Sequence, residues 1–261
     1  MLKNKFLYVL SSFLISTIFL FFQRITGPTY PIRGSINTKN SLIKFKFLRS
    51  CTLGEDCKII FNGKIDGYSL YKKYKVDEKY RKIDFNFDGK ISYVNLKLNL
   101  PKASKIEYDV FVKKLNDYIK INDKPIVLRF KGYVPAYILI PHIIFMYLFF
   151  FITTYIFLRI NLTNQIDKKL FYISLSFLIF GGFIFGPFVQ YYAFDVFWSG
   201  FPFGYDLTDN KTLLTLLVYF LPLRSMIKNK NIKMNFNIAY LLTTIVYLIP
   251  HSMYGSEYKF K

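Results

Sequence analysis

Five apolar runs interrupt the chain and predict its membrane-spanning helices. A hydrocarbon core of ~30 Å requires about 20 consecutive apolar residues in a helix. The first three runs meet that length, and the last two reach it if their helices begin near Thr208 and Ile232. The third run contains Gly182 and Gly186 in a G-x-x-x-G pattern, which permits close helix packing. The runs cover residues 6–22, 134–158, 170–189, 213–223 and 236–249.

The stretch between the first and second runs alternates apolar and polar residues over short segments, which is typical of strands. Turn signals such as Asn62-Gly63 and Asp88-Gly89 separate these segments. Strands at intervals of roughly ten residues favour an antiparallel β-sandwich. The last two look like the closing hairpin of an immunoglobulin- or fibronectin-like domain. The predicted strands cover residues 42–47, 58–61, 83–87, 93–98, 106–112 and 126–130.

The fold class we expect is therefore membrane α-helical, with about five transmembrane helices, plus an all-β extracytoplasmic sandwich. An N-terminal transmembrane anchor covers residues 1–23, and the sandwich covers 24–133. A four-helix transmembrane domain covers 134–261, with an outer-face loop at 190–211. The first run also fits a cleaved signal peptide, but it ends in Phe21-Phe22-Gln23-Arg24 without small residues, which favours a retained anchor.

Charge in the short loops predicts the orientation. Loops 159–169 and 224–235 carry three and four Lys and Arg residues, which is typical of the cytoplasmic side. Loop 190–211 carries three aspartates against one lysine and is expected on the other side. We therefore expect a protein of the bacterial inner (cytoplasmic) membrane, with a cytoplasmic N-terminus and with the β-domain and C-terminus outside.

The overall charge is strongly basic, with 36 Lys and Arg against 16 Asp and Glu and a formal net charge of +20. These residues are spread over loops and strands rather than along one stripe, which disfavours a nucleic-acid partner. The expected partners are the lipid bilayer, whose anionic headgroups attract lysine, and other membrane or periplasmic proteins.

The two cysteines, Cys51 and Cys57, flank a turn-like segment of five residues. Outside the cytoplasm such a pair is expected to form a disulfide that closes a hairpin. Two free thiols, or a redox or metal role, remain as alternatives. The C-x5-C spacing does not match a common zinc signature.

The tetrapeptide Leu-Ile-Pro-His occurs twice, and its copies carry the only two histidines, His142 and His251. With five spans, both lie near the outer boundary of the membrane. The prolines can simply shape the helices, with each imidazole bonded to a backbone carbonyl. The sharper hypotheses are that the histidines are axial ligands of a b-type haem, or that they join Asp206, Asp209 and Glu257 around a divalent metal.

The segment of residues 198–212 is rich in aromatic, glycine and acidic residues. Its Trp198 is the only tryptophan of the chain and is a candidate to contact a cofactor beside the histidines. The aromatic residues around it are also typical of a membrane interface. Asp206 or Thr208 can cap the fourth span, and Asp209 suits the positive end of that helix.

Short motifs rich in glycine, proline and charged residues are spread along the chain. The longest is W-x-G-x-P-F-G-x-D-L-T-D-N-K-T over residues 198–212. The others are Gly27-Pro28-Thr29-Tyr30-Pro31, Leu48-Arg49-Ser50, Arg129-Phe130-Lys131-Gly132 with Val134-Pro135-Ala136, Ile140-Pro141-His142, Gly186-Pro187, and Ile249-Pro250-His251 with Gly255-Ser256-Glu257.

Together these motifs, which cover most of the chain, resemble an uncharacterised family of bacterial multi-spanning inner-membrane proteins. The resemblance implies one anchor, an outer β-domain and four further spans. It implies no assigned activity, and Cys51 and Cys57 are not part of the family pattern.

The leading functional hypothesis is a redox-linked or haem- or metal-handling role, with His142, His251 and Trp198 at the cofactor. The alternative is a membrane-anchored assembly or interaction protein whose β-sandwich binds a periplasmic partner. A small transporter is favoured least, because the spans hold few ionisable residues. Enzymatic activity is not indicated, since the chain lacks a nucleophile with a base, a phosphate loop and an H-E-x-x-H helix.

Overall fold

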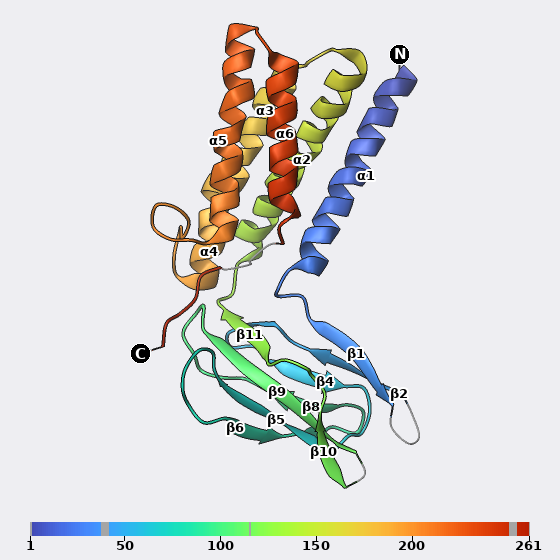
Figure 1. Cartoon of the computed structure of the whole chain (residues 1–261), viewed down its shortest axis with the longest axis vertical. Coiled ribbons are helices and arrows are strands. Elements are labelled where there is room, and N and C mark those ends of the chain that lie inside the picture. Colours follow the sequence, from blue (N-terminus) through green and yellow to red (C-terminus); the bar gives the residue numbers. More distant parts are fainter. Residues whose placement is uncertain (1, 38–41, 115, 251–254, 261) are drawn as a thin grey trace. The chain divides into compact units, whose positions relative to one another are not determined.

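The computed structural model describes residues 2–37, 42–114, 116–250 and 255–260. The chain forms two compact units, one helical and one rich in strands, and both are drawn in Figure 1. The helical unit consists of Met1–Pro28 and Val134–Gly255, and the β unit consists of Thr29–Tyr133 and Ser256–Lys261.

Helices form at all five apolar runs. Among the described residues, three helical segments are long and apolar enough to cross a membrane: Lys5–Thr26, Ala136–Thr163 and Lys168–Phe194. The third of these is a continuous segment in which a π-helical stretch, η1, joins two α-helices. The helices are α1 (Leu2–Thr26), α2 (Ala136–Thr163), α3 (Lys168–Leu178), η1 (Ile179–Phe185), α4 (Gly186–Phe194), α5 (Leu207–Lys228) and α6 (Ile232–Leu248).

Polar side chains define several helix ends. The carboxylate of Asp206 accepts the backbone N–H of Thr208 at 2.8 Å and caps α5, so Asp206 is the cap of the two candidates, Asp206 and Thr208. Asp167 caps α3 in the same way. Asn164 and Asn229 end α2 and α5 in the left-handed conformation, which asparagine tolerates better than most residues.

An aromatic cluster joins four helices of the helical unit. Phe149, Phe171, Tyr219 and Phe236 come from α2, α3, α5 and α6, and each is at most 1% exposed. The ring centroids of Phe149 and Tyr219 lie 5.3 Å apart, and those of Phe171 and Phe236 lie 6.2 Å apart. Each such pair contributes about 0.5–1.5 kcal/mol beyond its buried area, so the cluster holds these helices together.

The β unit contains two sheets. One has the strand order β1-β2-β4-β8-β7, and the other has the order β3-β11-β9-β5-β6, with β10 also paired to β9. All pairs are antiparallel except β3 with β11, which is parallel. The strands are β1 (Ile32–Asn37), β2 (Leu42–Phe47), β3 (Ser50–Thr52), β4 (Lys58–Phe61), β5 (Gly67–Lys73), β6 (Arg81–Asp84), β7 (Asn86–Phe87), β8 (Ser92–Asn95), β9 (Lys105–Lys114), β10 (Asp117–Lys120) and β11 (Ile126–Lys131).

Both sheets contribute to one hydrophobic core. Alternate residues of β9, namely Ile106, Tyr108, Val110 and Val112, point inward and are at most 3% exposed. Residues of β2, β4, β8 and β11 complete the same cluster. The alternation of apolar and polar residues therefore folds as expected, with one face of each sheet buried.

The predicted strands at 42–47 and 58–61 are confirmed. β9 and β11 pair antiparallel as expected, but the link between them contains a further strand, β10, that also pairs with β9. The single strand predicted at 83–87 is wrong, because it is β6 in one sheet and β7 in the other. The chain changes sheet at Phe85, whose ring packs on Phe61 in the core at a centroid distance of 5.3 Å. The predicted strand at 93–98 ends earlier, at Asn95.

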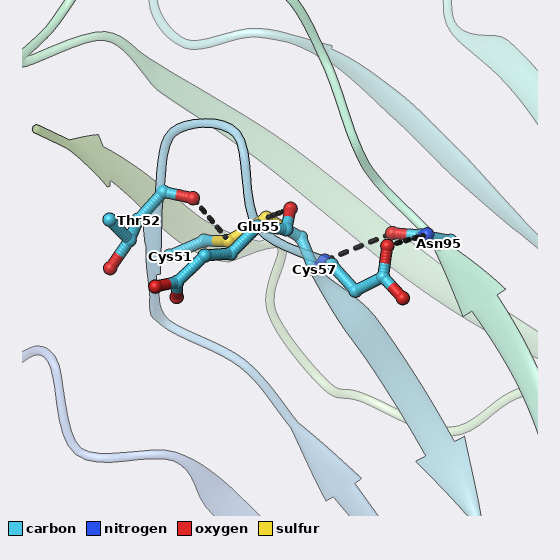
Figure 2. The surroundings of a disulfide bond; sticks show 6 residues. Cys51, Thr52, Glu55, Cys57 and Asn95 are labelled. Atoms are coloured by element: carbon cyan, nitrogen blue, oxygen red, sulfur yellow. Dashed lines mark hydrogen bonds between the residues drawn. A yellow bond between two sulfur atoms is a disulfide. The ribbon is translucent and has the colours of Figure 1, made fainter. Parts of the chain in front are cut away.

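Cys51 and Cys57 form a disulfide, which confirms the predicted pairing (Figure 2). Their Cα atoms lie 5.8 Å apart, and the bond closes the turn between β3 and β4. The backbone N–H of Cys57 donates to Oδ1 of Asn95 at 2.9 Å, and Asn95 donates in turn to Asp56. The turn is thus fixed to β8 as well as closed on itself.

The C-terminal tail, residues 256–260, belongs to the β unit. The backbone N–H of Tyr258 donates to the carbonyl of Ala103 at 3.0 Å. The carboxylate of Glu257 pairs with Lys105 and with Lys75, and Lys73 lies over the ring of Phe260. These contacts join the end of the chain to β5, β9 and the loops beside them.

Candidate functional site

The predicted site residues are divided between the two units. His142, Trp198, Asp206 and Asp209 belong to the helical unit, whereas Glu257 belongs to the β unit. His251 lies outside the described residues. Within the described part of the chain, no three His, Cys, Asp or Glu side chains gather as a group that could hold a metal ion.

His142 lies in the second turn of α2 and is half-buried. Its Nδ1 is 2.9 Å from the carbonyl oxygen of Gly181 in η1. Because a carbonyl only accepts, Nδ1 must carry the proton, and in the neutral ring Nε2 keeps its lone pair. The bond to a backbone carbonyl is one of the alternatives that the sequence left open. It also holds the ring as metal-ligating histidines are commonly held.

Asp209 ties the loop before α5 to the first turn of that helix. Its Oδ2 accepts the backbone N–H groups of Ser199 and Gly200 at 2.7 and 3.1 Å, and the Ser199 hydroxyl at 3.3 Å. The neighbouring Asn210 accepts the N–H of Phe201 at 2.7 Å. Sequence reasoning assigned Asp209 to the helix dipole or to a metal and missed this role, which depends on how the loop folds back.

Glycines allow the close approach that this site requires. A Cβ on Gly200 would lie 2.7 Å from Cβ of Asp209, so only glycine fits against the helix there. A Cβ on Gly182 would lie 2.5 Å from Cγ2 of Thr212, which brings η1 against α5. The second contact confirms the close packing predicted from the G-x-x-x-G pattern.

Lys211 joins the 198–212 motif to the second Leu-Ile-Pro-His motif. It is 5% exposed, and its ammonium donates to the carbonyls of Ile249 and, at 3.0 Å, Pro250. A lysine at the end of a helix satisfies carbonyls that have no partner within that helix. The buried cation therefore fixes the end of α6, a contact that no local pattern in the sequence indicates.

Trp198 packs beside the same elements. Its ring lies over Phe183 of η1 at a centroid distance of 5.9 Å, and its Nε1 donates to the carbonyl of Phe201 at 3.0 Å. Trp198 and His142 thus both contact η1, at Phe183 and Gly181, whereas Asp209 belongs to α5 and binds the loop before it. Of the two histidines predicted as cofactor ligands, His142 is the one whose position the structure describes.

Glu257 has lysine partners within the β unit. Partial burial alone would raise its pKa, but hydrogen bonds and charge from Lys105 and then Lys75 outweigh that effect and hold the pKa below its ordinary value. Burial lowers the pKa of Lys105, and the bond to Glu257 opposes that shift. The carboxylate therefore fastens the C-terminal tail in this structure.

A basic face on the β unit was missed by sequence reasoning. Arg33 of β1 lies directly opposite Lys46 of β2, and Lys44 projects from the same outer face. In the described part of the chain, none of these three cations forms an ion pair. Like charges directly opposite one another destabilise a sheet. In the sequence, Lys44 and Lys46 alternate with the buried Ile43 and Phe47, and this pattern could have identified the basic face.

The outer face of the other sheet is different, because several of its lysines are paired with carboxylates. Lys72 of β5 lies opposite Glu107 of β9 in the register, and the two form an ion pair at 3.4 Å. Lys120 pairs with Asp109 at 3.0 Å, and Lys82 pairs with Asp84 at 2.8 Å. These cross-strand and same-face pairs contrast with Arg33 and Lys46, which lie opposite each other with like charge.

No protein-family model matches this chain, and no curated protein matches it.

Proposed function

We propose that this protein is a membrane-anchored interaction protein whose β-sandwich binds an acidic extracytoplasmic protein through the basic face of Arg33, Lys44 and Lys46. The observation that carries the proposal is the Arg33–Lys46 pair, two cations directly opposite each other with no described counter-ion. Such a pair weakens the isolated sheet, so its presence is explained by an anionic partner that removes the repulsion on binding.

The proposed architecture has five membrane-spanning helices, with α5 and α6 crossing the bilayer beside the three longer apolar segments. The two-sheet unit is an immunoglobulin-like sandwich on the extracytoplasmic side of a bacterial inner membrane. Lysine-rich loops after α2 and α5 support this orientation, as does the Cys51–Cys57 disulfide, since disulfides persist outside the cytoplasm. Membership of the uncharacterised multi-spanning family is part of the same proposal.

The first test is retention of a partner by the full-length protein, purified gently from its own membranes at low ionic strength. We expect an acidic protein in a constant molar ratio, released by added salt because the contact is electrostatic. Lys46→Glu should abolish retention, whereas Lys113→Glu on the outer face of the other sheet should not. Equal retention by both variants would contradict the proposal.

The choice of Lys46→Glu separates binding from folding. Replacing the cation opposite Arg33 by a carboxylate converts a repulsive pair into an attractive one, worth about 0.5 kcal/mol of added stability. Loss of the partner together with an equally or more stable β unit therefore cannot result from misfolding. If binding persists, the lysines serve to keep an edge hairpin from pairing with other chains.

A second candidate function is the redox-linked or metal-handling role, supported by the His142–Gly181 bond at 2.9 Å. That bond orients the ring with Nε2 available to a haem or divalent metal, as in known histidine ligation. Visible absorption and elemental analysis of the purified protein test it. A Soret band or stoichiometric metal that is lost in His142→Ala would support it, and a colourless, metal-free protein unchanged by that substitution would exclude it.

A further inference from the structure

The segment between α4 and α5 exposes a group of aromatic side chains. Phe201, Phe203 and Tyr205 are 68%, 82% and 92% exposed, and the last two are the most exposed large hydrophobic side chains in the described part of the chain. No charged residue occurs from 196 to 205. Apolar groups of this kind commonly mark a surface that another molecule covers.

Hydrogen bonds hold the backbone of this loop in place. Asp209 binds the N–H groups of Ser199 and Gly200, and Asn210 binds that of Phe201. The carbonyl of Ser199 accepts the N–H of Asp206 at 2.9 Å, and that of Gly200 accepts the N–H groups of Phe203 and Gly204. In Figure 1 the loop folds back beside the ends of α4 and α5. The bonds to Asp209 and Asn210 hold residues 199–201 against the first turn of α5.

The exposed surface of the loop continues the outward surface of a helix long enough to span a membrane. Phe188 and Tyr191 lie within the apolar segment Lys168–Phe194 and are 42% and 41% exposed. The ring of Phe197 stacks on Tyr191 at a centroid distance of 4.4 Å and contacts Phe188 at 5.7 Å. Lipid that covers α4 would thus also meet the loop without a break in the apolar surface.

We propose that residues 196–205 form a membrane-interface wedge that inserts its aromatic rings into the boundary between lipid headgroups and acyl chains. Aromatic side chains favour this layer, and the exposed Asp195 at one end of the wedge would lie on its aqueous side. The buried carboxylate of Asp209 holds the wedge at that depth. This proposal concerns the helical unit and is independent of partner binding by the β unit.

Fluorescence of the single tryptophan tests the wedge directly. The full-length variant Trp198→Phe/Phe203→Trp moves the only tryptophan to the tip, and it is reconstituted in vesicles of zwitterionic and anionic phospholipid. Lipids brominated near the headgroup should reduce its emission about twofold or more, and lipids brominated deep in the chain should quench less, because the tip lies in the interfacial layer. Acrylamide in the water should quench it weakly.

The fluorescence quenching of Trp198 in the wild-type protein provides the reference, because its ring stacks on Phe183. A tip tryptophan that acrylamide quenches as freely as an unfolded peptide, and that neither brominated lipid quenches, would overturn the proposal and leave the rings for a protein partner. Adding Phe203→Asp to wild type should draw the loop towards water and raise acrylamide quenching of Trp198. The matched Tyr118→Asp, an exposed aromatic of the β unit, should not.

Discussion

Replacing Gly182 by alanine should drive η1 and α5 apart. The added Cβ would lie 2.5 Å from Cγ2 of Thr212, whereas carbon atoms in contact normally lie ~3.5–4.0 Å apart. Relief requires a shift of about 1 Å or more, or rotation of Thr212, which would break its 3.1 Å hydrogen bond to the carbonyl of Thr208. Overpacking of this kind costs about 1–3 kcal/mol. We expect Gly182→Ala to lower the free energy of unfolding by ~2 kcal/mol.

Thr212→Ser is the compensating change, because it removes Cγ2 and keeps the hydroxyl bonded to Thr208. Alone it should cost about 1 kcal/mol for the lost methyl group. Combined with Gly182→Ala, it should recover at least ~1 kcal/mol, which a double-mutant cycle measures as a coupling energy. Unfolding in mixed micelles titrated with sodium dodecyl sulfate, followed by helical circular dichroism, provides the four values. Strictly additive losses would refute the contact.

Three further predictions concern the disulfide, the contacts of Lys211 and the ion pairs of Glu257. Cys51→Ser/Cys57→Ser should lower the stability of the β unit by about 2 kcal/mol, measured by denaturant titration with hydrogen exchange, because the short loop is no longer closed in the unfolded chain. Lys211→Met should speed amide exchange at the end of α6, whereas the exposed Lys228→Met should leave it unchanged. The lowered pKa of Glu257 means that its contribution is complete above its ordinary pKa and is lost as pH falls through the folded value. Protection of the C-terminal tail, taken as the intrinsic exchange rate at each pH divided by the observed rate, should therefore fall in acid, and Glu257→Gln should remove that dependence.

Much of the architecture could be predicted because it depends on local patterns. The apolar runs place α6 at its observed start, Ile232, and the alternating segments identify β2 and β4. Asp206 was one of two predicted caps, with Thr208, because a cap needs only the residues that follow it. The disulfide was predictable from two cysteines on either side of a turn.

The remaining features depend on contacts between distant segments. The break between β6 and β7 follows from Phe85 entering the core, which no periodicity within 83–87 indicates. The partner of His142 is a carbonyl in a π-helical stretch 39 residues away. Glu257 binds Lys105, 152 residues earlier, so its place in the β unit could not be inferred from the motif beside it.

The basic face was within reach of sequence reasoning but was obscured by composition. With 36 Lys and Arg in the chain, Lys44 and Lys46 do not stand out. Only the register of β1 and β2 shows that Lys46 and Arg33 are direct cross-strand neighbours on the outer face. The same register shows that Lys72 faces Glu107 on the other sheet, so the significance of a lysine depends on its cross-strand neighbour.

The most direct test of the account is site-specific photocrosslinking in intact cells from position 35. Ser35 is exposed on β1 and lies opposite Lys44, so a photoreactive residue there reports on the basic face. We expect one discrete crosslinked product with an acidic protein, which Lys46→Glu abolishes although the β unit remains folded. A product that is unchanged by Lys46→Glu, or the absence of any product at position 35, would contradict binding through this face.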